Sequence, residues 1–241
     1  IENLNDDCFL EVLKYLSVRD LLNVSLVSRK WNEKFNSSKK TLDRIWLRFY
    51  EPLGDVNCLM NSTREYSSFK VQYMMPVKMN LVFNKFKWKN IILRDQEWKS
   101  YNEFVEFMKK LAPTVETLDL WDIDIKEEVV VFTKIDFPKL KKLEMNLTTR
   151  AAFSIFLGVN PMLKEVKITD YSFKFPRAQD QLMAPTNMIH ELIKANRIEK
   201  LTLLYCMWAF EHDLTESYTN SAYLNTLTVT FDSALNVPNA Q

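Results

Sequence analysis

The chain has 241 residues, of which 47% are hydrophobic, and its net charge is +1 at neutral pH. The hydrophobic content is enough for a real core, and the nearly neutral charge excludes an electrostatic case for nucleic-acid binding. No apolar run reaches the ~18 residues that would predict a membrane-spanning helix, and three widely spaced cysteines favour a reducing cytoplasmic or nuclear setting over a disulfide framework.

The segment Leu4–Phe35 predicts three short amphipathic helices. Apolar residues recur at helical spacing from Phe9 to Leu16 and again from Leu21 to Val27. Ser17 begins the second helix as an N-cap, with Asp20 three residues later in the acidic position of a capping box. Ser28 caps a third helix that carries Trp31. Such a segment is too small to form a domain alone.

These residues resemble the F-box, whose pattern begins Leu-Pro, continues with acidic and apolar residues, and ends on a Leu-Val and a tryptophan. Asn5 stands where the family usually has proline, and Ser28 where it usually has cysteine. The resemblance implies binding to a Skp-family adaptor. The alternative is an ordinary helical cap on a larger domain. The matching residues are Leu4, Asp6, Asp7, Leu10, Leu13, Tyr15, Leu16, Asp20, Leu21, Ser25, Leu26, Val27 and Trp31.

Three short helices cannot bury all of these apolar side chains, so we expect an exposed patch, which marks an interface. For any single residue, packing in the core is an equal alternative, and Trp31 fits either role. The residues expected to bind the adaptor are Leu4, Asn5, Leu10, Leu13, Leu16, Leu21, Leu22, Val24 and Trp31.

The next stretch, Thr41–Tyr50, predicts a helix with Leu42, Ile45, Trp46 and Phe49 on one face.

A repeated apolar pattern follows, in which the middle apolar residues of successive copies lie 23 to 35 residues apart. Leucine-rich repeats have a period of about 20–29 residues. Proline precedes three consecutive copies, and helical spacing recurs between them, as in Phe104–Leu111, Phe153–Leu157 and Met188–Ile193. The six copies are Trp88-Ile91-Leu93, Val115-Leu118-Leu120, Leu140-Leu143-Met145, Leu163-Val166-Ile168, Ile198-Leu201-Leu203 and Leu224-Leu227-Val229.

This pattern resembles the leucine-rich-repeat family in an irregular variant, and a generic α/β domain is the alternative. The expected fold class is α/β: a three-helix F-box, then a solenoid with parallel strands on the concave side and helices on the convex side. We expect an F-box at 1–40, a linker helix and connecting segment at 41–86, and about six repeats at 87–241. The uncovered last strand predicts further repeats beyond Gln241.

The sequence shows no set of residues that is typical of a catalytic site. Of the two histidines, His190 lies in an apolar helix and His212 has no convincing ligand spacing around it. Two glycines cannot form the usual phosphate-binding loop. We therefore expect no enzymatic activity, no cofactor and no metal.

An F-box joined to leucine-rich repeats resembles a substrate receptor of an SCF-type ubiquitin ligase. By that resemblance, the F-box binds a Skp-family adaptor and through it a cullin and a RING subunit, while the repeats hold a target protein. One alternative is a scaffold that recruits nothing for ubiquitination. Another is a plain interaction domain whose N-terminus only imitates an F-box.

Residues between and just after the core positions of each strand are expected to point to the concave surface. Large side chains there fit an interface, and the acidic ones suggest a basic target segment; packing under a loop or further repeats is an equal alternative. The residues expected to bind substrate are Asp119, Trp121, Asp122, Glu144, Leu204, Tyr205 and Phe231.

Overall fold

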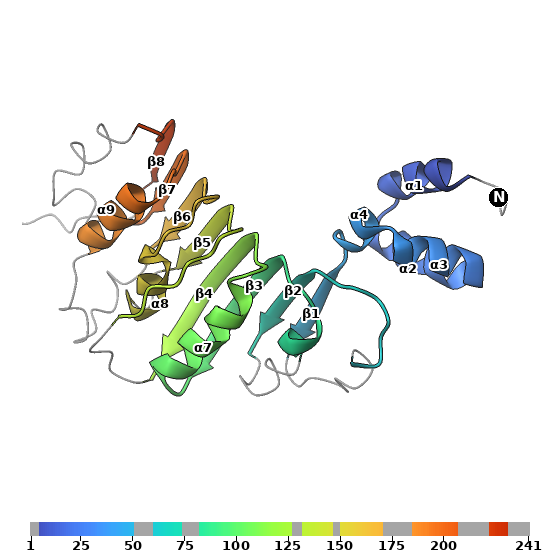
Figure 1. The fold of residues 1–241 in the computed structure, drawn as a ribbon, viewed down its shortest axis with the longest axis horizontal. Helices are drawn as coiled ribbons and strands as arrows, with labels where there is room; N and C mark the ends of the chain where they lie inside the picture. Colours follow the sequence, from blue (N-terminus) through green and yellow to red (C-terminus); the bar gives the residue numbers. More distant parts are fainter. Residues whose placement is uncertain are drawn as a thin grey trace, which may run out of the picture. The chain divides into compact units, whose positions relative to one another are not determined.

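A computed structural model describes residues 5–50, 60–73, 82–126, 132–146, 150–170, 185–206 and 222–230 (Figure 1). The chain forms two compact units, Ile1–Ile91 and Ile92–Gln241, and the division falls within a strand. No described helix is long and apolar enough to cross a membrane.

The first unit opens with four helices, α1 (Asp6–Tyr15), α2 (Val18–Val27), α3 (Arg29–Ser37) and α4 (Lys39–Leu42). Each begins at a polar side chain that accepts a hydrogen bond from a backbone N–H of the first turn. Asn5 accepts from Cys8, Ser17 from Asp20, Ser28 from Trp31 and Ser38 from Thr41. The three predicted helices, and the caps predicted at Ser17 and Ser28, are confirmed.

These helices share a small core. Phe9, Leu13, Leu21 and Phe35 are almost fully buried in it, together with Leu42 and Ile45 from the following segment. The ring of Phe9 meets Trp31 edge to face, with 5.1 Å between ring centroids. A core of this size depends on the residues after the third helix, because Leu42, Ile45 and the packed ring of Tyr66 close one side of it.

The helix predicted over Thr41–Tyr50 is wrong. Helix α4 ends at Leu42, and Trp46–Tyr50 is a strand, β1, which pairs in parallel with β2 (Ser68–Gln72). Leu42 and Ile45 do lie together in the core, but aromatic residues such as Trp46 and Phe49 favour a strand once a partner strand is available. The partner lies 22 residues along the chain, as the pairing of Trp46 with Ser68 shows, so a local pattern could not reveal it.

Six further strands continue the parallel sheet, in which strand order follows chain order. The middle apolar residues of the predicted repeats pair directly: Leu118 with Leu143, Leu143 with Val166, Val166 with Leu201, and Leu201 with Leu227. The predicted strands and their register are confirmed here. The strands are β3 (Asn90–Trp98), β4 (Thr117–Ile125), β5 (Lys142–Asn146), β6 (Glu165–Thr169), β7 (Lys200–Leu204) and β8 (Thr226–Thr230).

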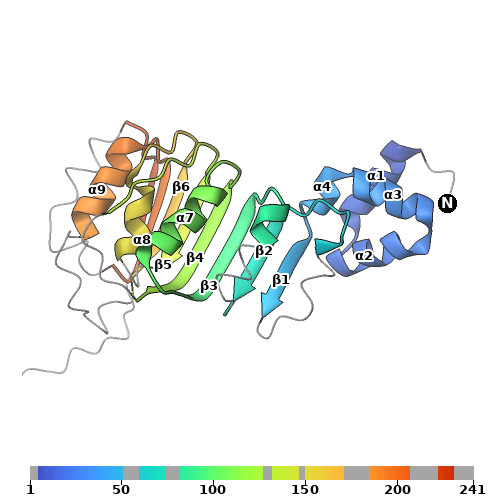
Figure 2. The same ribbon diagram turned by 60° about the horizontal axis from the view of Figure 1, so that its bottom comes forward.

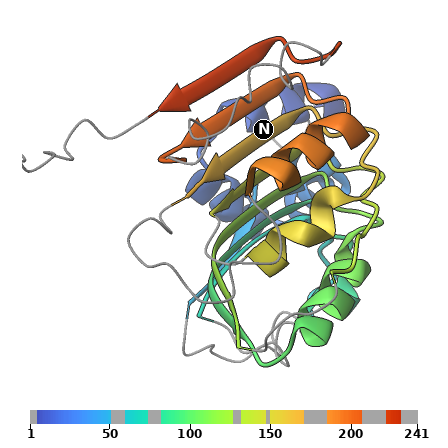
Figure 3. The same cartoon turned by 90° about the vertical axis from the view of Figure 1, so that its left-hand side faces the viewer.

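Helices connect several of these strands, namely α7 (Tyr101–Leu111), α8 (Arg150–Ser154) with the 3₁₀ turn η1 (Ile155–Leu157), and α9 (Pro185–Ala195). In the second unit, α7, α8 and α9 lie on the same side of the strands (Figures 2 and 3). Aromatic side chains pack between the strands and the helices. The ring centroids of Trp98 on β3 and Phe104 on α7 are 5.4 Å apart. The interstrand helices predicted from Phe104, Phe153 and Met188 are confirmed.

Four strands share a backbone feature that the sequence pattern did not predict. Tyr73, Asp95, Asp122 and Tyr205 adopt positive φ angles between 50° and 59°, and each follows the middle apolar residue of its strand by four positions. This conformation is uncommon outside glycine. It turns the next residue inward: Gln96, Ile123 and Cys206 are buried. The backbone therefore takes the same conformation at the same position of each repeat, just after β2 and β7 and within β3 and β4.

Candidate functional site

The first unit exposes two stripes of apolar side chains, which we call the apolar stripes. Helix α2 presents Val18, Leu22 and Leu26 at four-residue spacing, so they share one face. Helix α1 presents Val12 and Tyr15. Tyr15 is 82% exposed and Leu26 is 80% exposed, which is unusual for large apolar groups on short helices. Exposed apolar surface of this kind marks an interaction site.

The predicted adaptor residues divide between surface and core. Leu13 and Leu21 are buried in the helical core, so their assignment to the adaptor surface was wrong: both face the other helices. Leu22 is exposed, and Asn5 caps α1 at an exposed position. Leu4 lies outside the described residues. The remaining four predicted residues are only partly buried against the core: Leu10, Leu16, Val24 and Trp31.

Sequence reasoning left the most exposed groups out of its adaptor list, because helical spacing shows that a face is apolar without showing which residues turn inward. Helical spacing places Leu21 on a different face of α2 from Val18, Leu22 and Leu26, but it does not show which of the two faces is buried.

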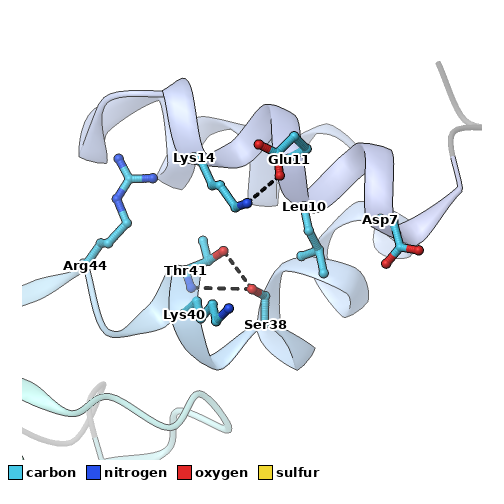
Figure 4. A pocket seen from close by; sticks show the side chains of 8 residues that line it. All are labelled: Asp7, Leu10, Glu11, Lys14, Ser38, Lys40, Thr41 and Arg44. Carbon is cyan, nitrogen blue, oxygen red and sulfur yellow. Dashed lines mark hydrogen bonds and ion pairs between the residues drawn. The ribbon is translucent and has the colours of Figure 1, made fainter.

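A pocket of about 440 Å³ lies between α1 and α4 (Figure 4). Its polar groups already bind one another: Lys14 donates to Glu11, and the hydroxyls of Ser38 and Thr41 are 2.8 Å apart. Arg44 directs its guanidinium to backbone carbonyls of α1. The lining residues are Asp7, Leu10, Glu11, Lys14, Ser38, Lys40, Thr41 and Arg44. This lining holds neither a histidine nor a thiol.

No group of three histidine, cysteine or acidic side chains among the described residues could hold a metal ion. Burial raises the pKa of the Cys206 thiol to about 12, with Asp170 adding to the shift, so this cysteine stays protonated and is a poor nucleophile.

Hydrogen bonds from two arginine side chains, which precede β1 and β2, connect the helices to the segments before these strands. Arg44 donates to the carbonyls of Leu13 (2.7 Å) and Leu16 (2.6 Å) at the end of α1. Arg64 donates to Ser25 and Asn32, both at 3.0 Å, and its guanidinium lies 5.4 Å from the centroid of the Phe35 ring. The helices that carry the apolar stripes are therefore stabilised by residues well beyond the third helix.

The carboxylate of Asp43 makes a third connection, because it accepts hydrogen bonds from Ser67 and Lys89. Burial opposes its ionisation, but hydrogen bonds from Ser67 and Lys89 outweigh burial and hold the pKa of this carboxyl below its ordinary value. Because Ser67 directly precedes β2 and Lys89 directly precedes β3, the charged carboxylate links the end of α4 to two strands of the sheet.

The second unit places a charged row across neighbouring strands. Asp119 on β4 pairs in register with Glu144 on β5, and Glu144 with Lys167 on β6. The side chain of Lys167 binds Glu144, and Arg94 lies 3.5 Å from Asp119. The predicted acidic stretch is thus brought together, but two of its three carboxylates have cationic partners within the chain.

Of the other predicted substrate residues, Trp121 and Asp122 lie within β4, while Leu204 ends β7 and Tyr205 follows it. Asp122 accepts a hydrogen bond from Asn146 at 3.1 Å, and Trp121 lies 5.7 Å from the Arg94 guanidinium. Trp121, Leu204 and Tyr205 are half-buried, whereas Phe231 lies outside the described residues. Asn146 and Thr169, which are not among the residues expected to bind substrate, are buried beside this group.

Replacing Asp119 with asparagine is expected to raise the free energy of unfolding at neutral pH. Burial raises the pKa of Asp119, Glu144 raises it further, and Arg94 opposes the shift. Between the ordinary aspartate pKa, about 4, and this higher value, the unfolded chain has released the proton that the folded chain retains, so wild-type stability falls as pH rises. Asparagine stays neutral throughout.

Urea unfolding at neutral and acidic pH measures this difference. The advantage of Asp119→Asn should shrink on acidification, and an advantage that grows instead would contradict the raised pKa. Glu106→Gln on the exposed face of α7 is the matched control, because it removes one surface charge from an ion pair with Lys109.

Comparison with known proteins adds one positive finding. Residues 1–43 match the family model of the F-box domain. No curated protein matches the chain. The chain therefore carries an F-box domain in its first unit, which supports an F-box protein. F-box domains bind Skp-family adaptors, and this suggests an adaptor role in an SCF-type ubiquitin ligase.

Proposed function

We propose that this chain is a substrate-recognition subunit of an SCF-type ubiquitin ligase. The observation that carries the proposal is the F-box match at residues 1–43 together with the apolar stripes of α1 and α2. Tyr15 and Leu26 are the central anchors of the adaptor surface, since large exposed groups of this kind dominate interface energies. Leu22 lies between Val18 and Leu26 and extends the same surface.

The second unit, in this proposal, is an irregular leucine-rich-repeat array that holds the target protein. Parallel strands in chain order support it, as do the paired middle apolar residues and the shared left-handed positions. The inward residue after the left-handed position donates to backbone carbonyls in two strands: Gln96 to Arg94 (2.5 Å) and Cys206 to Leu204 (3.4 Å). Units stacked this way bury their apolar side only against neighbours.

In this proposal the chain itself forms no covalent bond with ubiquitin or with the target. It supplies proximity, holding the target so that lysine attack on the activated ubiquitin becomes nearly intramolecular. The reduced thiols of Cys8 and Cys206 fit a reducing compartment, so we place the protein in the cytoplasm or the nucleus.

Co-expression with a Skp-family adaptor, followed by size-exclusion chromatography, tests the adaptor half. A stoichiometric complex is expected, with the lone chain poorly soluble because its apolar stripes face water. A well-behaved lone chain that ignores the adaptor would overturn the proposal. Co-purification of a cullin, together with a protein that accumulates when the chain is depleted, distinguishes a ligase receptor from a scaffold that recruits no target.

A further inference from the structure

Three strands of the second unit carry buried side-chain oxygens that have no hydrogen-bond partner among the described residues. Asp119 Oδ1, Asn146 Oδ1 and Thr169 Oγ1 are each buried without a partner in the described part of the chain. Asn146 is 4% exposed and Thr169 is 1% exposed. Such atoms are rare in folded proteins, and each costs stability that a matching donor would restore.

These acceptors come from three neighbouring strands. Asn146 on β5 pairs in register with Thr169 on β6, and its amide nitrogen donates to Asp122 beside β5. Because the nitrogen is directed to the Asp122 carboxylate, the amide oxygen is left as the unpaired atom. Asp119 lies on β4, three residues before Asp122. We call Asp119, Asp122, Asn146 and Thr169 the acceptor cluster.

The chemistry of this cluster selects a charged donor. It offers two carboxylates, an amide oxygen and a hydroxyl, so an ammonium or guanidinium group satisfies more of it than a neutral donor does. Among the described residues, Lys167 binds Glu144, and the Arg94 guanidinium lies 3.5 Å from Oδ2 of Asp119, which leaves Oδ1 without a donor.

Burial also selects a long side chain. The unpaired atoms themselves are covered, while Asp122, Trp121 and Leu204 next to them are half-exposed. A donor that reached these atoms from solvent would pass these three groups. Lysine and arginine can do so, since their apolar stems pack against rings and aliphatic groups while the charged head reaches farther in.

We propose that the acceptor cluster receives a lysine or arginine side chain of the protein segment bound to this strand face. The assignment rests on the proposed function, because it names the chemistry of the target. It moves the recognition point from Glu144, which already binds Lys167, toward Asp122, Asn146 and Thr169.

Binding of a short fluorescent oligolysine peptide to the whole chain, in complex with its adaptor, tests the assignment by anisotropy at low ionic strength. The net charge of +1 gives no general attraction for such a peptide. Asp122→Asn and Thr169→Val are each expected to weaken binding about tenfold or more. The same peptide with acetylated lysines should not bind, because acetylation removes the charge.

Thr169→Val separates recognition from folding. Valine replaces a buried unpaired hydroxyl with a methyl group, so thermal stability should stay the same or rise while peptide binding falls. Glu106→Gln is the matched charge control on α7 and should leave binding unchanged. Equal binding by all variants, equal weakening by Glu106→Gln, or binding of the acetylated peptide would overturn the assignment.

The same variants are scored for adaptor binding. Loss of peptide binding with the adaptor complex intact supports the assignment within the proposed function. A wild-type chain that binds no adaptor would refute the proposed function instead, and the peptide measurement, repeated on the chain alone, would still decide the acceptor cluster.

Discussion

A chain with Tyr15, Leu22 and Leu26 all changed to aspartate is expected to lose its Skp-family adaptor, with affinity reduced at least about a hundredfold. These side chains are exposed, so their replacement leaves the core of Phe9 and Phe35 intact. Burying three carboxylates against an apolar partner surface has a large desolvation cost. Pull-down of the adaptor, with helix content measured by circular dichroism, is the direct measurement.

A matched control carries Ser37→Asp and Lys39→Asp, which change the net charge of the same unit by an equal amount at exposed polar positions. The control should retain the adaptor. Retention by the triple variant, or equal loss in the control, would contradict the placement of the adaptor surface on the apolar stripes.

Arg44→Met is expected to lower the free energy of unfolding of the first unit by about 3 kcal/mol. Two carbonyls at the end of α1 lose a charged donor at 2.6 and 2.7 Å, and a cation at a helix C-terminus also interacts favourably with the helix dipole. Methionine keeps the length and apolar packing of the arginine stem. Chemical denaturation followed by tryptophan fluorescence gives the change.

Arg29→Met serves as the control, because Arg29 is 94% exposed at its side chain and pairs only with Glu33 on its own helix. Its effect should stay within about 0.5 kcal/mol. If Arg44→Met unfolded no more readily than Arg29→Met, the hydrogen bonds from Arg44 to the end of α1 would contribute nothing to the free energy of unfolding. Adaptor affinity of Arg44→Met should fall with stability, since α1 carries Tyr15.

Local signals specified the helical segment. The caps at Ser17 and Ser28 and the apolar spacing around Phe9 involve residues within one or two helical turns, so they are readable from the chain itself. The choice between core and surface was different. Leu21 and Leu22 are adjacent and chemically identical, and only packing against the other helices buries one and exposes the other.

The strand register was also determined by the sequence, because each repeat carries the same apolar pattern and parallel neighbours align like with like. Leu143 therefore pairs with Val166 as predicted. The segment Trp46–Tyr50 shows the limit of this reasoning: its apolar spacing fits a helix, and a distant partner, β2, makes it a strand.

For this protein the sequence alone predicted the three N-terminal helices and the order of the later strands, since those depend on short-range spacing. Tertiary structure decided which apolar groups reach the surface and which polar groups lose their partners. Asp119 and Glu144 acquired Arg94 and Lys167 as neighbours, while Asn146 and Thr169 were buried without a donor. These properties depend on side chains that different strands bring together, and no local pattern encodes that proximity.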